Sequence, residues 1–291
     1  MLIGVNRANQ DLVIFLTVSL GLVCFRSAGL AMRILGVVLF AIAAVLKFFP
    51  LVTLVLLLEF RSRRQVLLGA LAYGSVLLLA WPGLAPALRL LADKHAPAPD
   101  WLYAYGAPIL ARDLGILTPL AWLVPAVFVI GWAGWDAIRR APAAPTVPVA
   151  PDDSAEREFI CGAVMVVGIF FVGASYVYKL TFAIWMWPWL WRSRADHSAG
   201  RWARVIMRLL LGLAWIEGLA ALILNGVTGL WSTAVALILL KTVLVIAQVL
   251  GWALVACLLR FLWAYSWRRG REWLGGPRQA APENTLPGAA A

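Results

Sequence analysis

Long apolar runs, separated by short charged or proline-rich breaks, fill most of this chain of 291 residues. A helix that crosses a membrane needs about 20 predominantly apolar residues. The runs therefore predict an all-α, polytopic transmembrane bundle of about nine full or partial membrane helices over residues 1–275. The apolar runs are Leu12–Phe25, Ile34–Leu46, Leu51–Phe60, Val66–Trp81, Leu114–Trp135, Phe159–Val177, Thr181–Trp191, Val205–Leu224 and Trp231–Phe261.

Two pairs of these runs are short and admit two interpretations. Ile34–Phe60 is either one kinked helix or a hairpin that turns at Lys47–Pro50, where Pro50 disfavours a continuous helix. Phe159–Trp191 poses the same choice, with a turn at Tyr176–Lys179. The hairpin interpretation is favoured for both pairs, because it keeps the arginines that flank them on one side of the membrane.

With both hairpins, the N-terminus lies outside and the C-terminus in the cytoplasm, and the basic residues become strongly asymmetric, as the positive-inside rule expects. Five basic residues lie outside: Arg7, Arg89, Lys94, Arg112 and Lys179. Sixteen lie in cytoplasmic loops or the tail: Arg26, Arg33, Arg61, Arg63, Arg64, Arg139, Arg140, Arg157, Arg192, Arg194, Arg201, Arg204, Arg268, Arg269, Arg271 and Arg278. The proline-rich linker near 141–157 is then cytoplasmic, and residues 276–291 form a disordered cytoplasmic tail.

The short runs predict half-length helices that re-enter the membrane. A helix of 13 residues rises only about 20 Å, whereas the hydrocarbon core is about 30 Å thick. Non-helical backbone at that depth is tolerated only where it is buried in protein or lines a wet cavity. We therefore expect re-entrant hairpins and a polar pocket that opens to the outside.

Composition excludes the soluble classes. Apolar residues make up 63% of the chain and charged residues only 13%, about half of what a soluble domain carries. The net charge of +11 fits basic cytoplasmic loops and predicts no nucleic-acid partner. The isolated cysteines and the two distant histidines indicate no disulfide, metal site or bound cofactor.

Charged residues inside membrane segments are candidates for function. Lys47 and Lys179 sit at the two hairpin tips, where they could bind an anion such as a lipid phosphate, or instead reach the outer headgroups and fix the hairpins. Tyr176 and Tyr178 flank the second lysine and are typical of interface anchors. Asp11 lies at the start of the first membrane segment, where it could act as an acid/base group or cap the N-terminus of the helix.

Two further features could be structural or functional. Glu217 and Lys241 lie at matching depth on either side of a turn near Gly226–Gly229, so we expect a buried ion pair. The outer loop Pro82–Asp113 could bind an acceptor or be a plain surface loop.

Three segments in order resemble the GT-C superfamily of membrane glycosyltransferases, in particular its bacterial mannosyltransferase-like branch that uses polyprenyl-phosphate sugars. They are Asn6–Asp11, Ala43–Pro50 followed by an arginine cluster, and Gly173–Leu180. In that branch R-x-N-x-D, K-x-[YF]-P and Y-x-Y-R segments recur in this order. The resemblance covers about residues 5–190.

The resemblance implies a multi-pass enzyme of the bacterial inner membrane that transfers a hexose, such as mannose, to an extracytoplasmic glycan or lipid acceptor. Residues that would hold the donor phosphate are Arg7, Asn9, Lys47, Tyr176, Tyr178 and Lys179. Lys179 departs from the usual arginine and cannot form a bidentate fork. The family's catalytic carboxylate follows an earlier helix that is not found here. The chain could therefore be the C-terminal part of such an enzyme, a partner chain could supply the missing part, or the chain could be an inactive paralogue. Asp11 is only a candidate base.

Two other functions remain open from the sequence. A non-catalytic membrane subunit of envelope glycan or lipid assembly could bind lipid phosphates without transferring sugar. A transporter could also contain a polar pocket within the membrane.

Overall fold

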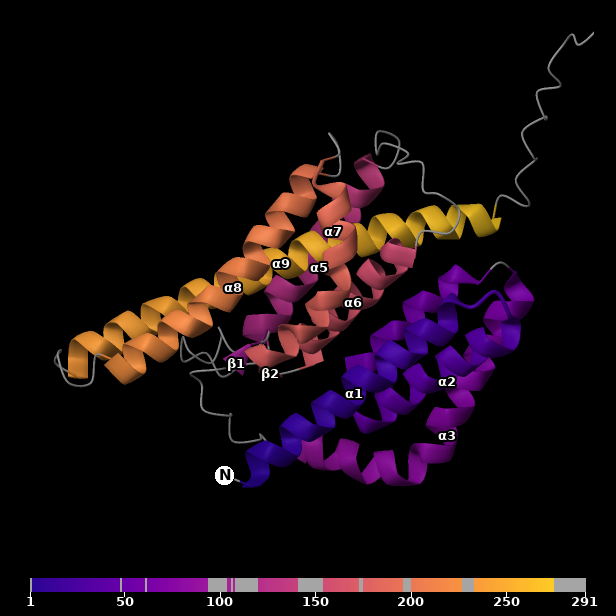
Figure 1. The fold of residues 1–291 in the computed structure, drawn as a ribbon, viewed down its shortest axis with the longest axis horizontal. Helices are drawn as coiled ribbons and strands as arrows, with labels where there is room; N and C mark the ends of the chain where they lie inside the picture. Colours follow the sequence, from indigo (N-terminus) through magenta and orange to yellow (C-terminus); the bar gives the residue numbers. More distant parts are fainter. Residues whose placement is uncertain are drawn as a thin grey trace, which may run out of the picture.

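The computed structural model describes residues 2–47, 49–60, 62–93, 104–105, 107, 120–140, 154–172, 175–195, 200–226 and 233–274. This part of the chain is helical apart from one pairing of two short strands, which confirms the predicted all-α class (Figure 1). In chain order the elements are α1 (Leu2–Arg26), α2 (Leu30–Leu46), η1 (Phe49–Glu59), α3 (Arg63–Asp93), β1 (Ala104–Tyr105), α5 (Leu120–Arg140), α6 (Ser154–Val172), β2 (Ser175–Tyr176), η3 (Val177–Met186), α7 (Trp187–Ser193), α8 (Gly200–Gly226) and α9 (Thr233–Leu274).

The first elements form a unit in which the chain reverses twice. α1 and α2 pack antiparallel at close range, because Gly21 and Gly36 bring no side chain between their backbones. A Cβ atom on Gly36 would lie only 2.6 Å from the Gly21 carbonyl oxygen. The chain then turns back into η1, so that Arg33 near the start of α2 donates a hydrogen bond of 2.9 Å to the carbonyl of Glu59 at the end of η1. The second reversal lies at the predicted turn, Lys47–Pro50.

The returning arm, η1, is a 3₁₀ helix of 11 residues. A 3₁₀ helix rises about 2.0 Å per residue against about 1.5 Å in an α-helix. η1 therefore extends about 22 Å, close to the roughly 26 Å of the 17-residue α2. The predicted helix Ile34–Leu46 is shorter than the observed α2, which begins one turn earlier, at Leu30. Re-entry of this hairpin into a membrane remains a prediction.

A second hairpin is formed by α6 with η3 and α7. Phe159 near the start of α6 lies against Trp189 of α7, with ring centroids 4.3 Å apart. Gly162 permits a close approach to the returning arm, since a Cβ atom there would lie 2.6 Å from Met186 Cγ. The reversal begins earlier than predicted, so that Tyr178 and Lys179 belong to the returning arm η3.

The core of the molecule surrounds α6. Every residue from Phe159 to Phe170 is buried, because η1, η3, α7 and α9 pack around this helix. A helix that is apolar on all sides needs such enclosure. The two hairpins are therefore joined through α6 rather than through a sheet.

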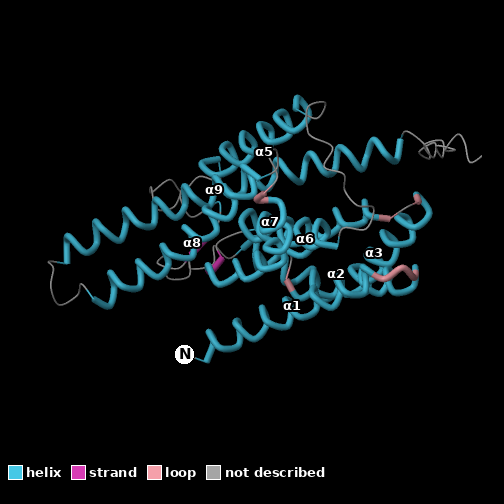
Figure 2. The backbone as a smooth tube through the Cα atoms, turned by 45° about the horizontal axis from the view of Figure 1, so that its top comes forward, coloured by secondary structure: helices cyan, strands magenta, loops and turns pink. Residues whose placement is uncertain are grey.

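One long helix, α9, connects this core to the last hairpin. Its 42 residues rise about 63 Å. The N-terminal half packs against α8 through Leu240, Val243 and Leu244, and the C-terminal half packs against α5, α6 and η1. Figures 1 and 2 show α8 and α9 side by side and extending beyond the other helices.

Among the described residues, two segments are long and apolar enough to cross a membrane by length and composition, Arg63–Pro86 in α3 and Ile238–Arg271 in α9. Only 11% of the apolar window of α3 is buried inside the molecule. Leu78 and Leu79 of this helix are 78% and 84% exposed. Such bare apolar surface is typical of contact with lipid or another protein and indicates membrane association.

The structure bears on two predicted boundaries, and a third lies outside the described residues. α3 continues through Pro82 and Pro86 to Asp93, so the first part of the expected outer loop is helical. α6 begins at Ser154, so the expected linker near 141–157 ends in a helical turn. The predicted tail, 276–291, is outside the described part of the chain.

Candidate functional site

The turn that carries Lys47 is fixed by buried hydrogen bonds. Lys47 follows the last residue of α2 in an extended conformation, and its backbone N–H donates to the Ala43 carbonyl at 3.1 Å. The Pro50 carbonyl accepts two hydrogen bonds, from the Thr53 hydroxyl at 2.6 Å and from the Tyr73 hydroxyl at 3.2 Å. Because Tyr73 belongs to α3, the turn is held both from within η1 and from the neighbouring helix, and Lys47 itself is half-buried.

The predicted donor-binding segments lie toward one end of the bundle. Glu59, at the end of η1, contacts Arg157, at the start of α6. The packed elements η1 and α6 are therefore antiparallel, so the turn after Lys47 lies toward the same end as the C-terminus of α6 and the start of η3. We call this end, which carries Lys47 and the backbone of Tyr176–Lys179, the motif end.

The first turns of α1 also lie toward the motif end, since α1 is antiparallel to α2. Phe15 stacks on Trp185 at 4.9 Å and contacts Phe182 at 5.8 Å, both in η3. Asp11 precedes Phe15 by about 6 Å along α1, and Lys179 precedes Phe182 by about 6 Å along η3. The backbones of Asp11 and Lys179 thus lie at similar levels along the bundle, on the neighbouring elements α1 and η3.

Arg7 and Asn9 also belong to α1. Their side chains, and those of Asp11, Tyr176, Tyr178 and Lys179, lie outside the described structure, so their roles remain predictions. The interpretation of Asp11 as a helix cap was wrong, because α1 begins at Leu2 and Asp11 lies in its third turn.

Part of the expected outer loop meets the second hairpin. β1 pairs antiparallel with β2, with Ala104 opposite Tyr176 and Tyr105 opposite Ser175. This pairing attaches the loop between α3 and α5 to the Gly173–Leu180 segment. Any acceptor surface on that loop would therefore lie beside the predicted donor-binding segment.

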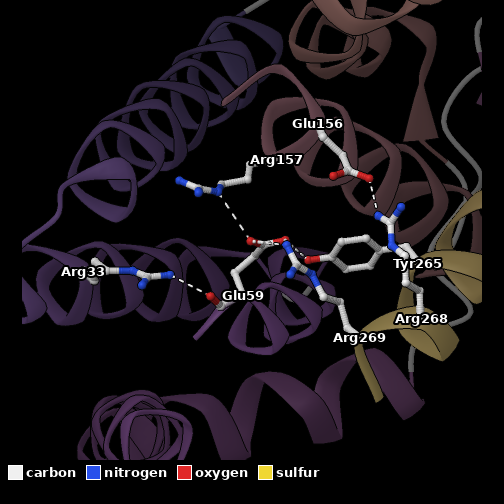
Figure 3. Close-up of polar contacts among 7 residues, drawn as sticks. All are labelled: Arg33, Glu59, Glu156, Arg157, Tyr265, Arg268 and Arg269. Atoms are coloured by element: carbon white, nitrogen blue, oxygen red, sulfur yellow. Dashed lines mark hydrogen bonds and ion pairs between the residues drawn. The ribbon is translucent and has the colours of Figure 1, made fainter. Parts of the chain in front are cut away.

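A second polar cluster, which the sequence analysis missed, lies at the opposite end of the bundle (Figure 3). Its centre is Glu59, which is 7% exposed. The carboxylate accepts hydrogen bonds of 3.0 and 3.1 Å from Arg269 and lies 3.4 Å from Arg157. The Tyr265 hydroxyl also donates to it. We call the end that carries Glu59, Arg157 and Arg269 the basic end.

Three flanking ion pairs extend this cluster. Glu158 accepts from Arg26 at 2.6 Å, Asp136 accepts from Arg260 at 2.5 Å, and Glu156 accepts from Arg268. They join α6 to α1, α5 to α9, and α6 to α9. The sequence signal was present in Glu59, two residues before the cluster Arg61–Arg64, and in Glu156 and Glu158 on either side of Arg157. The positive-inside interpretation assigns those arginines only to loops.

The surroundings of Glu59 favour a structural carboxylate over an acid/base group. Two arginines and a tyrosine hydroxyl already contact its oxygens. Beside it, the Arg33 guanidinium lies over the rings of Phe25 and Phe60, at 5.0 and 4.7 Å from their centroids. Such cation–π contacts tie α2 to α1 and η1.

The remaining candidates can be placed only in part. Lys241 lies on α9 with its side chain exposed, while the side chain of Glu217 on α8 lies outside the described structure, so their ion pair stays a prediction. Within the described residues, no group of three or more His, Cys, Asp or Glu side chains could hold a metal ion. Cys24, Cys161 and Cys257 are buried and unbonded to one another.

Comparisons of this chain with protein-family models, with curated proteins and with solved structures found no match.

Proposed function

We propose that this chain is an integral membrane glycosyltransferase that transfers a hexose, such as mannose, from a polyprenyl-phosphate sugar to an acceptor outside the bacterial inner membrane. The observation that supports the proposal is that the segments containing Asp11, Lys47 and Tyr178–Lys179 all lie toward the motif end. These segments are far apart in sequence, and their resemblance to one family of enzymes requires them to share a site.

The proposed chemistry is an inverting transfer. The acceptor hydroxyl oxygen forms a bond to the anomeric carbon while the bond from that carbon to the phosphate oxygen breaks. The hydroxyl proton passes to a carboxylate, for which Asp11 is the candidate, and the lipid phosphate leaves with the bonding electrons. Lys47 and Lys179 stabilise the charge on the departing phosphate, and Tyr178 shapes the pocket.

The proposed orientation places the motif end outside and the basic end in the cytoplasm. Arg26, Arg33, Arg157, Arg268 and Arg269 all take part in contacts at the basic end. Their common location supports the assignment of these five arginines to one side of the membrane. The positive-inside rule then gives that side as cytoplasmic.

The first experiment measures binding of a polyprenyl-phosphate hexose to the purified full chain in detergent micelles. We expect Lys47→Gln and Lys179→Gln each to weaken binding about tenfold or more, since each removes a charge-assisted contact to phosphate. Arg139→Gln is the control, because it removes an exposed positive charge near the end of α5, away from the motif end. Unchanged affinity in both test variants would remove these lysines from the site.

The second experiment follows transfer of labelled hexose from the same donor, with extracted envelope glycans and lipids as acceptors. We expect Asp11→Asn to abolish transfer while leaving donor binding intact. The competing function is a membrane subunit that binds lipid phosphates without transferring sugar. Donor binding by the unmodified chain without any transfer would favour that subunit.

A further inference from the structure

At the basic end, the described acidic side chains are buried or half-buried, whereas several arginines are exposed on the surface of the molecule. The structure describes four acidic side chains, and none of them is exposed. All four lie at this end, and each is in contact with an arginine. The side chains of Arg63, Arg64 and Arg139, by contrast, are exposed. Among the described residues, the molecular surface at the basic end is therefore strongly positive.

The positive surface is most concentrated where α7 is followed by α8. Four exposed arginines lie there: Arg192 in α7, Arg194 directly after it, and Arg201 and Arg204 in α8. The Arg204 guanidinium donates a 2.6 Å hydrogen bond to the Arg194 carbonyl. Gly200 allows this approach, since a Cβ atom there would lie 2.7 Å from the same oxygen. We call Trp191, Arg192, Arg194, Arg201 and Arg204 the arginine surface.

Tryptophan is part of this surface. The Arg194 guanidinium lies 3.3 Å from the centroid of the Trp191 ring, and Trp191 is 48% exposed. Five of the other exposed tryptophans lie on the parts of α5, α7 and α9 near the basic end, namely Trp132, Trp135, Trp187, Trp263 and Trp267, whereas Trp81 and Trp215 lie on α3 and α8. Exposed indole rings beside apolar helices are typical of the boundary between hydrocarbon and headgroups.

We propose that the arginine surface binds the phosphate groups of anionic phospholipids in the adjacent leaflet. Guanidinium groups match phosphate oxygens with two parallel hydrogen bonds. The ring of Trp191 beside Arg194 places an interfacial anchor next to the charge. A soluble polyanion explains the arginines but not the accompanying tryptophans. The site lies at the opposite end from Lys47 and does not depend on sugar transfer.

The test uses the full chain reconstituted in phosphatidylcholine nanodiscs, to which phosphatidylglycerol is added in steps. Bound phosphatidylglycerol is counted by native mass spectrometry, with added phosphatidylcholine as the neutral comparison. In the proposed site each of these arginines forms charge-assisted hydrogen bonds to a bound lipid phosphate, in addition to the general attraction of an anionic leaflet. We therefore expect Arg194→Gln with Arg201→Gln to weaken phosphatidylglycerol binding about thirtyfold or more.

The matched control is Arg63→Gln with Arg64→Gln, which removes the same charge from the start of α3 at the same end of the molecule. We expect at most a twofold change for this pair, because it lies apart from the arginine surface. An equal loss in both double variants would overturn the proposal, since it would show diffuse attraction without a site. Preferential binding of a single-stranded oligonucleotide or of inorganic phosphate over phosphatidylglycerol would also overturn it.

Folding is monitored independently by the thermal unfolding of each variant in phosphatidylcholine alone. Arg194→Lys provides a second variant that keeps the charge but loses the planar group over Trp191. We expect it to bind phosphatidylglycerol more weakly than the unmodified chain and more strongly than the double variant. Binding unchanged in both Arg194→Lys and the double variant would contradict a role for this surface.

Discussion

Glu59 shows how one side chain can hold several elements together. Its carboxylate connects η1 to α6 through Arg157 and to α9 through Arg269 and Tyr265. Its backbone carbonyl connects η1 to Arg33 of α2. The acidic group at the centre is 7% exposed, so its pairing is shielded from water much better than a surface ion pair.

We expect Glu59→Gln to lower the free energy of unfolding by about 3–5 kcal/mol, because two arginines then lose their buried counter-charge. Thermal and denaturant unfolding of the full chain in detergent measures this loss. Glu158→Gln is the control, since its partner Arg26 is 43% exposed, and a pair of that kind contributes about 0–1 kcal/mol. Equal stability losses in the two variants would contradict the central position of Glu59.

At the residue scale the sequence located candidate charges but not their partners. Lys47 was recognised because a lysine inside an apolar run is costly. Glu59 was missed because its partners lie about 100 and 210 positions later in the chain, at Arg157 and Arg269. Such a cluster depends on how α6 and α9 pack, which the local pattern of apolar and charged residues does not specify.

At the scale of elements, glycines set the closest contacts between neighbouring helices. Gly36 of α2 faces the backbone of α1, where a Cβ atom would lie 2.6 Å from the Gly21 carbonyl oxygen and 2.9 Å from the Phe25 nitrogen. Backbone atoms cannot move aside as a flexible side chain can. The spacing of α1 and α2 therefore depends on this residue.

We expect Gly36→Ala to destabilise the chain by about 1–3 kcal/mol, as overpacking does in well-packed cores. Gly131→Ala is the matched control, because nothing lies within 4 Å of its added Cβ atom and alanine favours a helix by about 1 kcal/mol. Unfolding of both variants in detergent gives the comparison. A Gly36→Ala variant as stable as the unmodified chain would show that α1 and α2 can separate at no cost.

The order and type of the elements could be predicted largely from the sequence, but their lengths could not. Pro50 correctly indicated the reversal between α2 and η1, because proline lacks a donor and restricts the residue before it. The ends of α3 and α9 were missed since both helices continue past prolines or arginines that we had taken as boundaries. The 3₁₀ winding of η1 and η3 had no signal in the apolar pattern, because it depends on their packing against α6.

At the scale of the whole molecule, the two ends differ in charge and composition. The basic end collects exposed arginines and tryptophans, and the motif end carries the segments around Asp11, Lys47 and Lys179. The sequence predicted this polarity through the positive-inside rule. It could not predict that β1, which follows α3, pairs with β2 beside the second motif segment, since this pairing joins residues about 70 positions apart.

The polarity gives a direct test of the membrane orientation. We expect Ser62→Cys and Arg201→Cys to react with a membrane-impermeant maleimide only from the cytoplasmic side, and Lys47→Cys only from outside. Labelling of intact cells and of inverted vesicles measures the difference. The three natural cysteines are buried, so the unmodified chain serves as a control with little background. Reaction of Ser62→Cys and Arg201→Cys on opposite sides would contradict the topology.

The continuity of α9 has a mechanical consequence. The helix runs without proline from its packing with α8 to the contacts of Tyr265 and Arg269 with Glu59. When one end of such an unbroken helix tilts, the other end moves with it. In the proposed membrane orientation, a change in bilayer thickness around the α8–α9 hairpin would therefore either bend α9 or displace its far end, which holds the Glu59 carboxylate through Tyr265 and Arg269.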